Sequence, residues 1–220
     1  MIITESKPFQ EILDYLENGT TLFLVGCGSC AAQCETGGED QVRAMADRLR
    51  EHGKQITGQI IPDETCHIPL VKKQLNENRE ALKQTDAVLV LACGAGTQAV
   101  SSLVNKPVYP ACNTLFLGDV KRLGDFTEYC SLCGECILGQ TGGICPVTRC
   151  PKGILNGPCG GMHDGRCETD EDQECVWVQI WERLRELGCL HHMKKRRPPK
   201  NHAKKRKPGA YRVERLRKRK

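Results

Sequence analysis

Eight of the chain's cysteines lie within 46 residues, from Cys130 to Cys175. Their positions are Cys130, Cys133, Cys136, Cys145, Cys150, Cys159, Cys167 and Cys175. Leu, Ile and Val fill a protein core without reactive groups, so packing alone does not explain this density. Thiols spaced this closely form disulfides or bind metals. The sequence therefore predicts a segment that is organised by its sulfur atoms more than by an apolar core.

The chain has 15 cysteines in all, so complete disulfide pairing would leave one thiol over. The first residues, MIITESKPFQEILDYLENG, have the pattern of an amphipathic helix and lack the basic start and apolar centre of a secretory signal. No apolar run is long enough to span a membrane. We therefore expect a cytoplasmic protein, in which clustered cysteines bind metal more often than they form disulfides. A disulfide framework and redox-sensing thiols are the remaining alternatives.

The basic residues gather at the C-terminal end. Residues 194–220 hold 15 of the 32 Lys and Arg residues and one of the 27 Asp and Glu residues. Residues 1–193 therefore carry 17 basic and 26 acidic side chains, a net charge of −9 against +14 beyond them. A segment so poor in apolar residues cannot build a core, and we expect a disordered basic tail over 191–220.

Strands and helices alternate over residues 1–125, which predicts an α/β domain with a parallel, flavodoxin-like sheet. Apolar, β-branched runs predict strands at 20–25, 55–61, 87–91 and 107–110. Helical spacing of apolar residues predicts helices at 38–53, 68–83 and 95–103. The periodic pattern ends near residue 125, and residues 126–190 form an irregular Cys-rich metal-binding domain whose one long helix is expected at 175–187.

The spacing Cys130-x2-Cys133-x2-Cys136 is typical of three ligands of a ferredoxin-type iron–sulfur cluster, whose fourth ligand is a distant Cys followed by Pro. Cys145-Pro146 and Cys150-Pro151 both have that form. Eight thiolates make two sites of four ligands. Zinc is the alternative, but it prefers separate C-x2-C pairs, which this segment lacks. The spacing favours iron–sulfur clusters over zinc.

A second set of cysteines follows the predicted strands of the α/β domain. Its members are Cys27, Cys30, Cys34, Cys66, Cys93 and Cys112. Ligands of open α/β sheets bind beyond the carboxyl ends of the strands, which is where all six lie, so we predict a metal site there. Small core residues are the alternative, above all for Cys66 and Cys112, which stand alone in their loops.

We expect Cys93 to complete the site of Cys27, Cys30 and Cys34. A strand order of 2-1-3-4 puts the first strand between the second and the third, so the Cys27 loop faces the ends of both. Cys93 lies near the tip of the third strand, whereas Cys66 follows a proline in a looser loop.

The string CSLCGECILGQTGGICPVTRCPKGILNGPCGGMHDGRCETDEDQECVW, from Cys130 to Trp177, resembles the Cys-rich domain found at the C-terminus of methylenetetrahydrofolate reductases. Together with CGSCAAQC at Cys27–Cys34, residues 1–190 are similar to the small subunit of the two-subunit methylenetetrahydrofolate reductase of acetogenic bacteria. The resemblance implies that Cys27, Cys30, Cys34 and the eight later cysteines bind metal, as two or three [4Fe–4S] clusters or as zinc. It also implies that the flavin lies only in a large partner subunit.

We therefore expect an iron–sulfur electron-transfer subunit of one-carbon metabolism, which takes electrons from an upstream donor and passes them to that flavoenzyme. No nucleophile–base pair is visible, and we name no catalytic residue. A zinc-stabilised structural subunit of the same complex is the first alternative. A nucleic-acid-binding module is the second, although the acidic body and an aromatic content of 5% argue against it.

Overall fold

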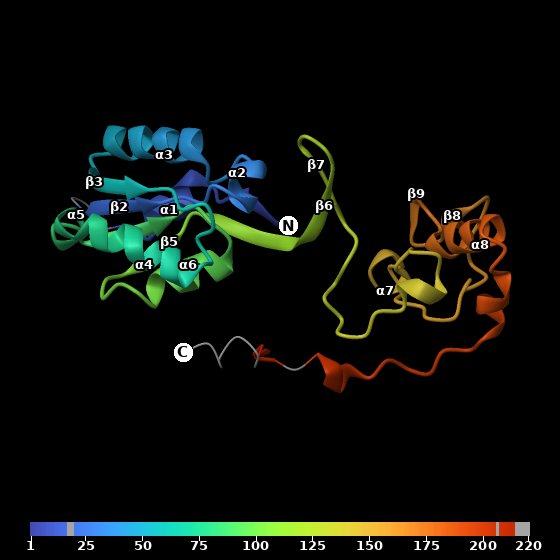
Figure 1. Cartoon of the computed structure of the whole chain (residues 1–220). Helices are drawn as coiled ribbons and strands as arrows, with labels where there is room; N and C mark the ends of the chain where they lie inside the picture. The colour runs from blue at the N-terminus through green and yellow to red at the C-terminus, as the bar shows by residue number, and fades with distance from the viewer. Residues whose placement is uncertain (17–19, 206, 214–220) are drawn as a thin grey trace. The chain divides into compact units, whose positions relative to one another are not determined.

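The computed structural model of the chain describes residues 1–16, 20–205 and 207–213. It divides into two compact units, of which the first is Met1–Thr127 and the second begins at Glu128 (Figure 1). The predicted boundary lies two residues earlier. Within the described residues, no helix is long and apolar enough to cross a membrane.

A parallel sheet of four strands forms the centre of the first unit. The strands are β2 (Thr21–Val25), β3 (Gln55–Ile60), β4 (Ala87–Val90) and β5 (Val108–Pro110). They are hydrogen-bonded in the order β3-β2-β4-β5, and each pair runs parallel. This is the predicted order, with the first strand of the sheet between the second and the third. The α/β fold and its flavodoxin-like sheet are confirmed.

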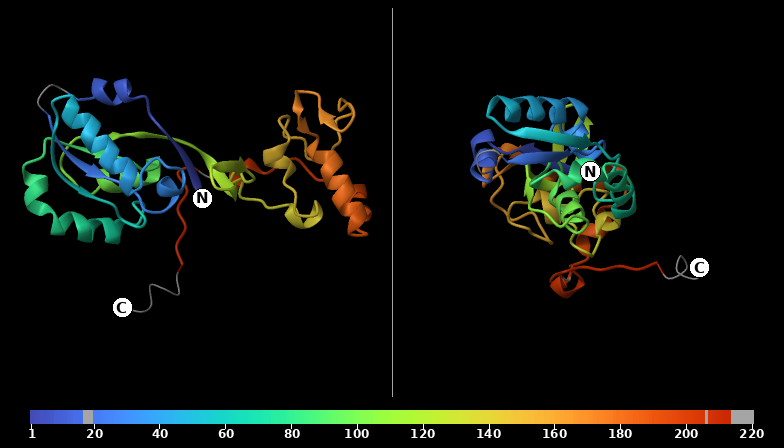
Figure 2. Two further views of the ribbon diagram at one scale, coloured as in Figure 1. Left: turned by 90° about the horizontal axis from the view of Figure 1, so that it is seen from above. Right: turned by 90° about the vertical axis from the view of Figure 1, so that its left-hand side faces the viewer.

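Helices cover both faces of this sheet (Figures 1 and 2). They are α1 (Phe9–Asp14), α2 (Cys30–Gln33), α3 (Glu39–Glu51), α4 (Ile68–Glu77), α5 (Arg79–Lys83) and α6 (Gly94–Ser101). Alternate residues of β2 point to opposite faces, so Leu22 and Leu24 pack with α3, whereas Phe23 and Val25 pack with α4 and α6. All four side chains are fully buried. Burial on both faces explains the nearly continuous apolar sequence of this strand.

The first residues are a strand, and the prediction of a helix from residue 1 is wrong there. Strand β1 (Ile2–Ser6) pairs antiparallel with β6 (Cys112–Arg122), which is followed in a separate three-stranded sheet by β7 (Asp125–Glu128). Ile3 and Thr4 are buried in this pairing. Only α1 remains of the expected helix. The backbone hydrogen bonds to β6, a strand far away in the sequence, outweigh the local helical pattern.

The second unit has little regular structure. Its elements are η1 (Leu138–Gln140), α7 (Pro146–Arg149), β8 (Arg166–Cys167), β9 (Asp170–Glu174), α8 (Val176–Glu186), η2 (Leu190–Lys194) and η3 (His202–Lys204). The expected helix at 175–187 is confirmed as α8, which packs against the irregular loops beside it (Figure 2). Trp177, Ile180 and Leu184 of α8 belong to the buried apolar cluster of this unit.

The disorder of the tail from residue 191 onward stays a prediction, although part of this segment makes defined contacts in the structure. Arg197 is only 8% exposed, and Lys204 and Lys205 both contact the cysteine-rich loops. Composition excludes an apolar core for this segment, but it does not exclude hydrogen bonds and ion pairs to a neighbouring surface. Residues 214–220 lie outside the described part of the chain.

Candidate metal-binding sites

The first cysteine group is built from a loop and the start of α7. The loop turns sharply at Leu132 and Gly134, whose φ angles are +54° and +77°. Cys145 directly precedes α7, and its thiol lies 3.7 Å from the Thr148 hydroxyl. The same hydroxyl accepts a hydrogen bond of 2.9 Å from the Ser131 backbone N–H. Thr148 thus connects the Cys130–Cys136 loop to Cys145.

Four cysteines line one pocket of about 210 Å³ in this region. They are Cys130, Cys133, Cys136 and Cys145. Apolar side chains of Ile137, Leu138 and Val147 complete much of the wall. The three members of the C-x2-C-x2-C run therefore share a pocket with one of the two cysteines that precede a proline.

The other four cysteines line a second and much smaller pocket, of about 20 Å³. They are Cys150, Cys159, Cys167 and Cys175. Met162 and Trp177 lie in the same wall. A Lys152–Glu168 ion pair crosses the loops beside this pocket, and the Gln173 side chain donates a hydrogen bond of 2.8 Å to the Arg149 carbonyl. The pocket volume is enough for about one water-sized group.

The spacing of the cysteines left the grouping of the eight open, and the fold divides them by pocket into two sets of four. Cys145, not Cys150, lies with the C-x2-C-x2-C run. Across the described residues, however, no three His, Cys, Asp or Glu side chains converge as ligands of one metal ion. The two pockets therefore show which cysteines are neighbours, and the binding of metal by each set stays a prediction.

Two thiols of these groups lie in surroundings that favour the thiolate. Burial opposes ionisation of Cys133, but hydrogen bonds with Lys200 and with the Glu135 backbone lower the pKa of its thiol overall. The pKa of Cys167 is lowered by hydrogen bonds with the side chain and backbone of Thr169. Thiolates are the form of cysteine that binds metal.

The cysteines of the first unit lie at the carboxyl edge of the parallel sheet, as expected from their positions in the sequence. Cys27 follows β2, Cys30 begins α2 and Cys34 ends it, while Cys93 caps the start of α6. Cys27 is buried, and the other three are partly exposed. Their role as metal ligands stays a prediction.

The loops that carry these cysteines are hydrogen-bonded to one another and pack closely. The Cys27 N–H donates a hydrogen bond of 2.7 Å to the Gly37 carbonyl, and a Cβ at Gly37 would lie 1.9 Å from the Leu91 carbonyl oxygen. The fully buried Thr65 hydroxyl donates to the Gly26 carbonyl. These contacts join the ends of β2, β3 and β4. Sequence reasoning missed Thr65 and Gly37, because single Thr and Gly residues carry no signal of a long-range contact.

Cys66 and Cys112 are the two remaining cysteines of the first unit. Burial raises the pKa of both thiols, and Cys93 lies near enough to raise each of them further. Cys66 also lies near Cys27, and Cys112 lies near Cys34. Cys93 is thus the one cysteine that affects both thiols, and its role in completing the site of Cys27, Cys30 and Cys34 stays a prediction.

Arg197 and Lys200 contact the cysteine-rich loops of their own unit and were not identified from the sequence. Both lie in a run of basic residues, and nothing in that run distinguishes a buried arginine from a solvated one. The adjacent Pro198 and Pro199 could have indicated that this part of the basic segment is ordered, because consecutive prolines restrict the backbone to an extended path.

Comparison with known protein families identifies one similarity. Residues 109–203 match the family model described as "Methylene-tetrahydrofolate reductase C terminal". The match covers both cysteine groups of the second unit and reaches past Lys200. No curated protein and no solved structure matches the chain. The similarity supports a relationship between this chain and methylene-tetrahydrofolate reductase.

Proposed function

We propose that this chain is an iron–sulfur electron-transfer subunit that works with a flavin-containing methylenetetrahydrofolate reductase. One observation carries the proposal: eight cysteines line two pockets in sets of four, within a region similar to the C-terminal domain of that enzyme. We propose a cytoplasmic location as well, because clustered thiols remain free to bind metal where the surroundings are reducing.

The first group of four suits a [4Fe–4S] cluster better than a single zinc ion. Four thiolates on one zinc ion lie about 3.8 Å apart, because Zn–S bonds are about 2.3 Å long and the geometry is tetrahedral. No three such side chains of the described residues converge in either group, so the comparison between zinc and a cluster rests on the size of each pocket. The pocket of about 210 Å³ leaves room for a larger group with several iron atoms.

The surroundings of this pocket suit a redox centre. A bound cluster would supply the ability to accept and release one electron. Cys130, Cys133, Cys136 and Cys145 would hold it, and the Leu132 N–H lies 3.4 Å from the Cys130 sulfur, where it can donate to a thiolate. Ile137, Leu138 and Val147 would limit the access of water to the sulfurs.

At the second group of four cysteines, zinc is a stronger candidate than an iron–sulfur cluster. Its pocket, of about 20 Å³, has room for a single ion but not for a cluster unless Met162 or Trp177 moves. Zinc held by Cys150, Cys159, Cys167 and Cys175 would hold together loops that have few buried apolar side chains. A structural zinc ion here is compatible with electron transfer at the first group.

A third metal site is proposed at Cys27, Cys30, Cys34 and Cys93. It is supported by the position of these residues at the carboxyl edge of the sheet. The partner flavoenzyme would receive the electrons, and a separate donor would supply them. Neither the flavin nor the folate is expected to bind this chain.

The test is metal and sulfide analysis of protein purified without oxygen, with Cys145→Ala and Cys189→Ala as a matched pair. Cys189 lies outside both pockets, and its thiol donates to the Leu187 carbonyl. We expect iron and acid-labile sulfide in the unsubstituted protein, loss of about one cluster in C145A and no loss in C189A. A colourless protein that contains zinc and no sulfide would contradict electron transfer and favour the structural alternative.

A further inference from the structure

Arg197 holds the basic segment against the cysteine-rich loops through several hydrogen bonds. Its guanidinium donates hydrogen bonds of 3.1 Å to the Leu155 and Gln140 carbonyls. Its backbone N–H donates to the Asn156 side chain at 2.7 Å, and the Asn156 amide donates back to the Arg197 carbonyl at 2.9 Å. The guanidinium also lies 5.7 Å from the centre of the Trp177 ring. Four hydrogen bonds and burial make Arg197 a fixed point in a segment otherwise rich in exposed lysine.

Beyond this point, three lysines contact the loop that carries the first cysteine group. Lys200 lines a cavity together with Glu135 of this loop. The Lys204 ammonium lies 2.5 Å from a Glu135 carboxylate oxygen, and Lys205 donates a hydrogen bond of 2.8 Å to the Ser131 carbonyl. These partners lie between Cys130 and Cys136. The contacts therefore fall on the C-x2-C-x2-C run itself.

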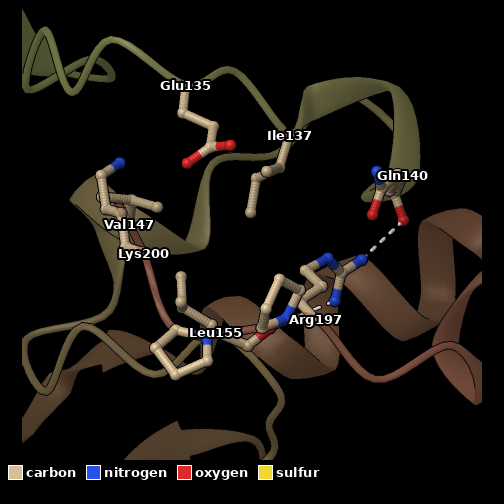
Figure 3. Close-up of a pocket in the computed structure, with 9 residues that line it drawn as sticks. Glu135, Ile137, Gln140, Val147, Leu155, Arg197 and Lys200 are labelled. Carbon is tan, nitrogen blue, oxygen red and sulfur yellow. Dashed lines mark hydrogen bonds between the residues drawn. The ribbon is translucent and has the colours of Figure 1, made fainter. Parts of the chain in front are cut away.

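The backbone of the basic segment also approaches this loop closely. A Cβ at Gly134 would lie 3.0 Å from the Lys204 carbonyl oxygen. From Arg197 to Lys200, the segment borders a cavity of about 140 Å³ (Figure 3). Glu135 and Ile137 line it from the loop and its C-terminal end, Val147 lines it from α7, and Arg197 and Lys200 line it from the basic segment. The segment thus crosses the loop as a strap that is held at its two ends.

We propose that residues 197–205 form a strap that holds the metal of the first cysteine group in place, with Arg197 as its anchor and with Lys200, Lys204 and Lys205 as its contacts to the Cys130–Cys136 loop. This inference rests on the proposed metal site. Four thiolates around a metal centre leave a net negative charge, which an adjacent ammonium stabilises through a charge-assisted hydrogen bond. Arg197 and Lys200 both lie within the region of family similarity, which extends to residue 203.

The experiment compares Lys200→Met with Lys195→Met in the full chain. Lys195 is exposed, lies five residues earlier in the same basic segment and does not line the cavity beside the loop, so its substitution removes the same charge without affecting that contact. Metal release to a chelator is followed while the freed thiols are alkylated and identified by mass spectrometry. In K200M we expect the affinity of the first group for its metal to fall about 10- to 100-fold. A loss of this size is usual when a group that supports a metal ligand is removed.

Only Cys130, Cys133, Cys136 and Cys145 should gain reactivity in K200M. The second cysteine group should release its metal as in the unsubstituted protein, and Lys200→Arg should restore slow release because it keeps the charge. Equal release from K200M and K195M, with metal present in both, would overturn the strap and leave the proposed function intact. A metal-free unsubstituted protein would overturn the proposed function itself, and the two failures are therefore distinguishable.

Discussion

Cys112 has the most strongly shifted titration among the cysteines of the first unit. It begins β6, is 5% exposed, and has a thiol pKa of about 11 against an ordinary value of 9.0, chiefly because burial disfavours the thiolate. At neutral pH this side chain is therefore a neutral thiol that packs as a small core residue. Its thiol donates toward the Thr36 carbonyl at 3.6 Å. These properties favour the core interpretation of Cys112 over a role as a metal ligand.

The raised pKa predicts a loss of stability at high pH. The unfolded chain ionises this thiol near pH 9, whereas the folded chain does so only near pH 11. The contribution to the free energy of unfolding is therefore complete below pH 9 and is lost as the pH rises through 11, by up to about 3 kcal/mol. Urea unfolding at pH 8 and at pH 10.5 measures the effect. Cys112→Ala should be destabilised at pH 8 but should lose less stability between the two pH values than the unsubstituted chain.

At the scale of one element, α8 organises the second unit through Trp177. This side chain is 2% exposed, and its indole N–H donates a hydrogen bond of 3.0 Å to the Ile154 carbonyl. Gly157 makes room for it, since a Cβ there would lie 2.4 Å from the indole ring. Trp181, one turn further along α8, is 41% exposed. The same helix therefore carries one buried and one exposed tryptophan, and substitutions of the two can be compared directly.

Trp177→Ala should destabilise the second unit by about 3 to 5 kcal/mol, because it removes a large buried side chain and leaves the Ile154 carbonyl without its donor. Trp181→Ala should cost less than about 1 kcal/mol, since it loses an exposed ring and its contact with Arg185. Urea unfolding followed by circular dichroism measures both variants at the same metal content. Similar losses in the two variants would contradict the role given to Trp177.

At the scale of the whole molecule, the two units differ in what stabilises them. Among the described residues, the first unit has two apolar clusters of 13 and 11 buried residues, whereas the second has a single cluster of five. A unit of the second kind has too little apolar burial to offset the entropy of ordering its loops. Bound metal is the expected additional source of stability.

Removal of metal should therefore affect the units unequally. After chelation, we expect protease to cleave within residues 128–205 and to leave a resistant fragment close to 1–127. Untreated protein provides the control, and mass spectrometry identifies the fragments. If both units resist protease equally after chelation, the second unit does not depend on metal for its folding.

The α/β class, the strand order and the position of α8 can be predicted from the amino-acid sequence alone. These follow from local periodicity together with general rules for parallel sheets, and both are present in a single chain. The sequence also placed the cysteines of the first unit at one edge of the sheet, because strand ends are visible as the end of an apolar run.

The contacts between residues far apart in the sequence are visible only in the folded chain. The pairing of β1 with β6 replaced the expected N-terminal helix, since it depends on a partner more than a hundred residues away. The loops grouped Cys145, and not Cys150, with the first three cysteines, although both precede a proline. Arg197 and Lys200 look like any other basic residues until their partners are known. Hydrogen bonds and ion pairs between distant segments leave no periodic pattern, and for that reason they appear only in the folded molecule.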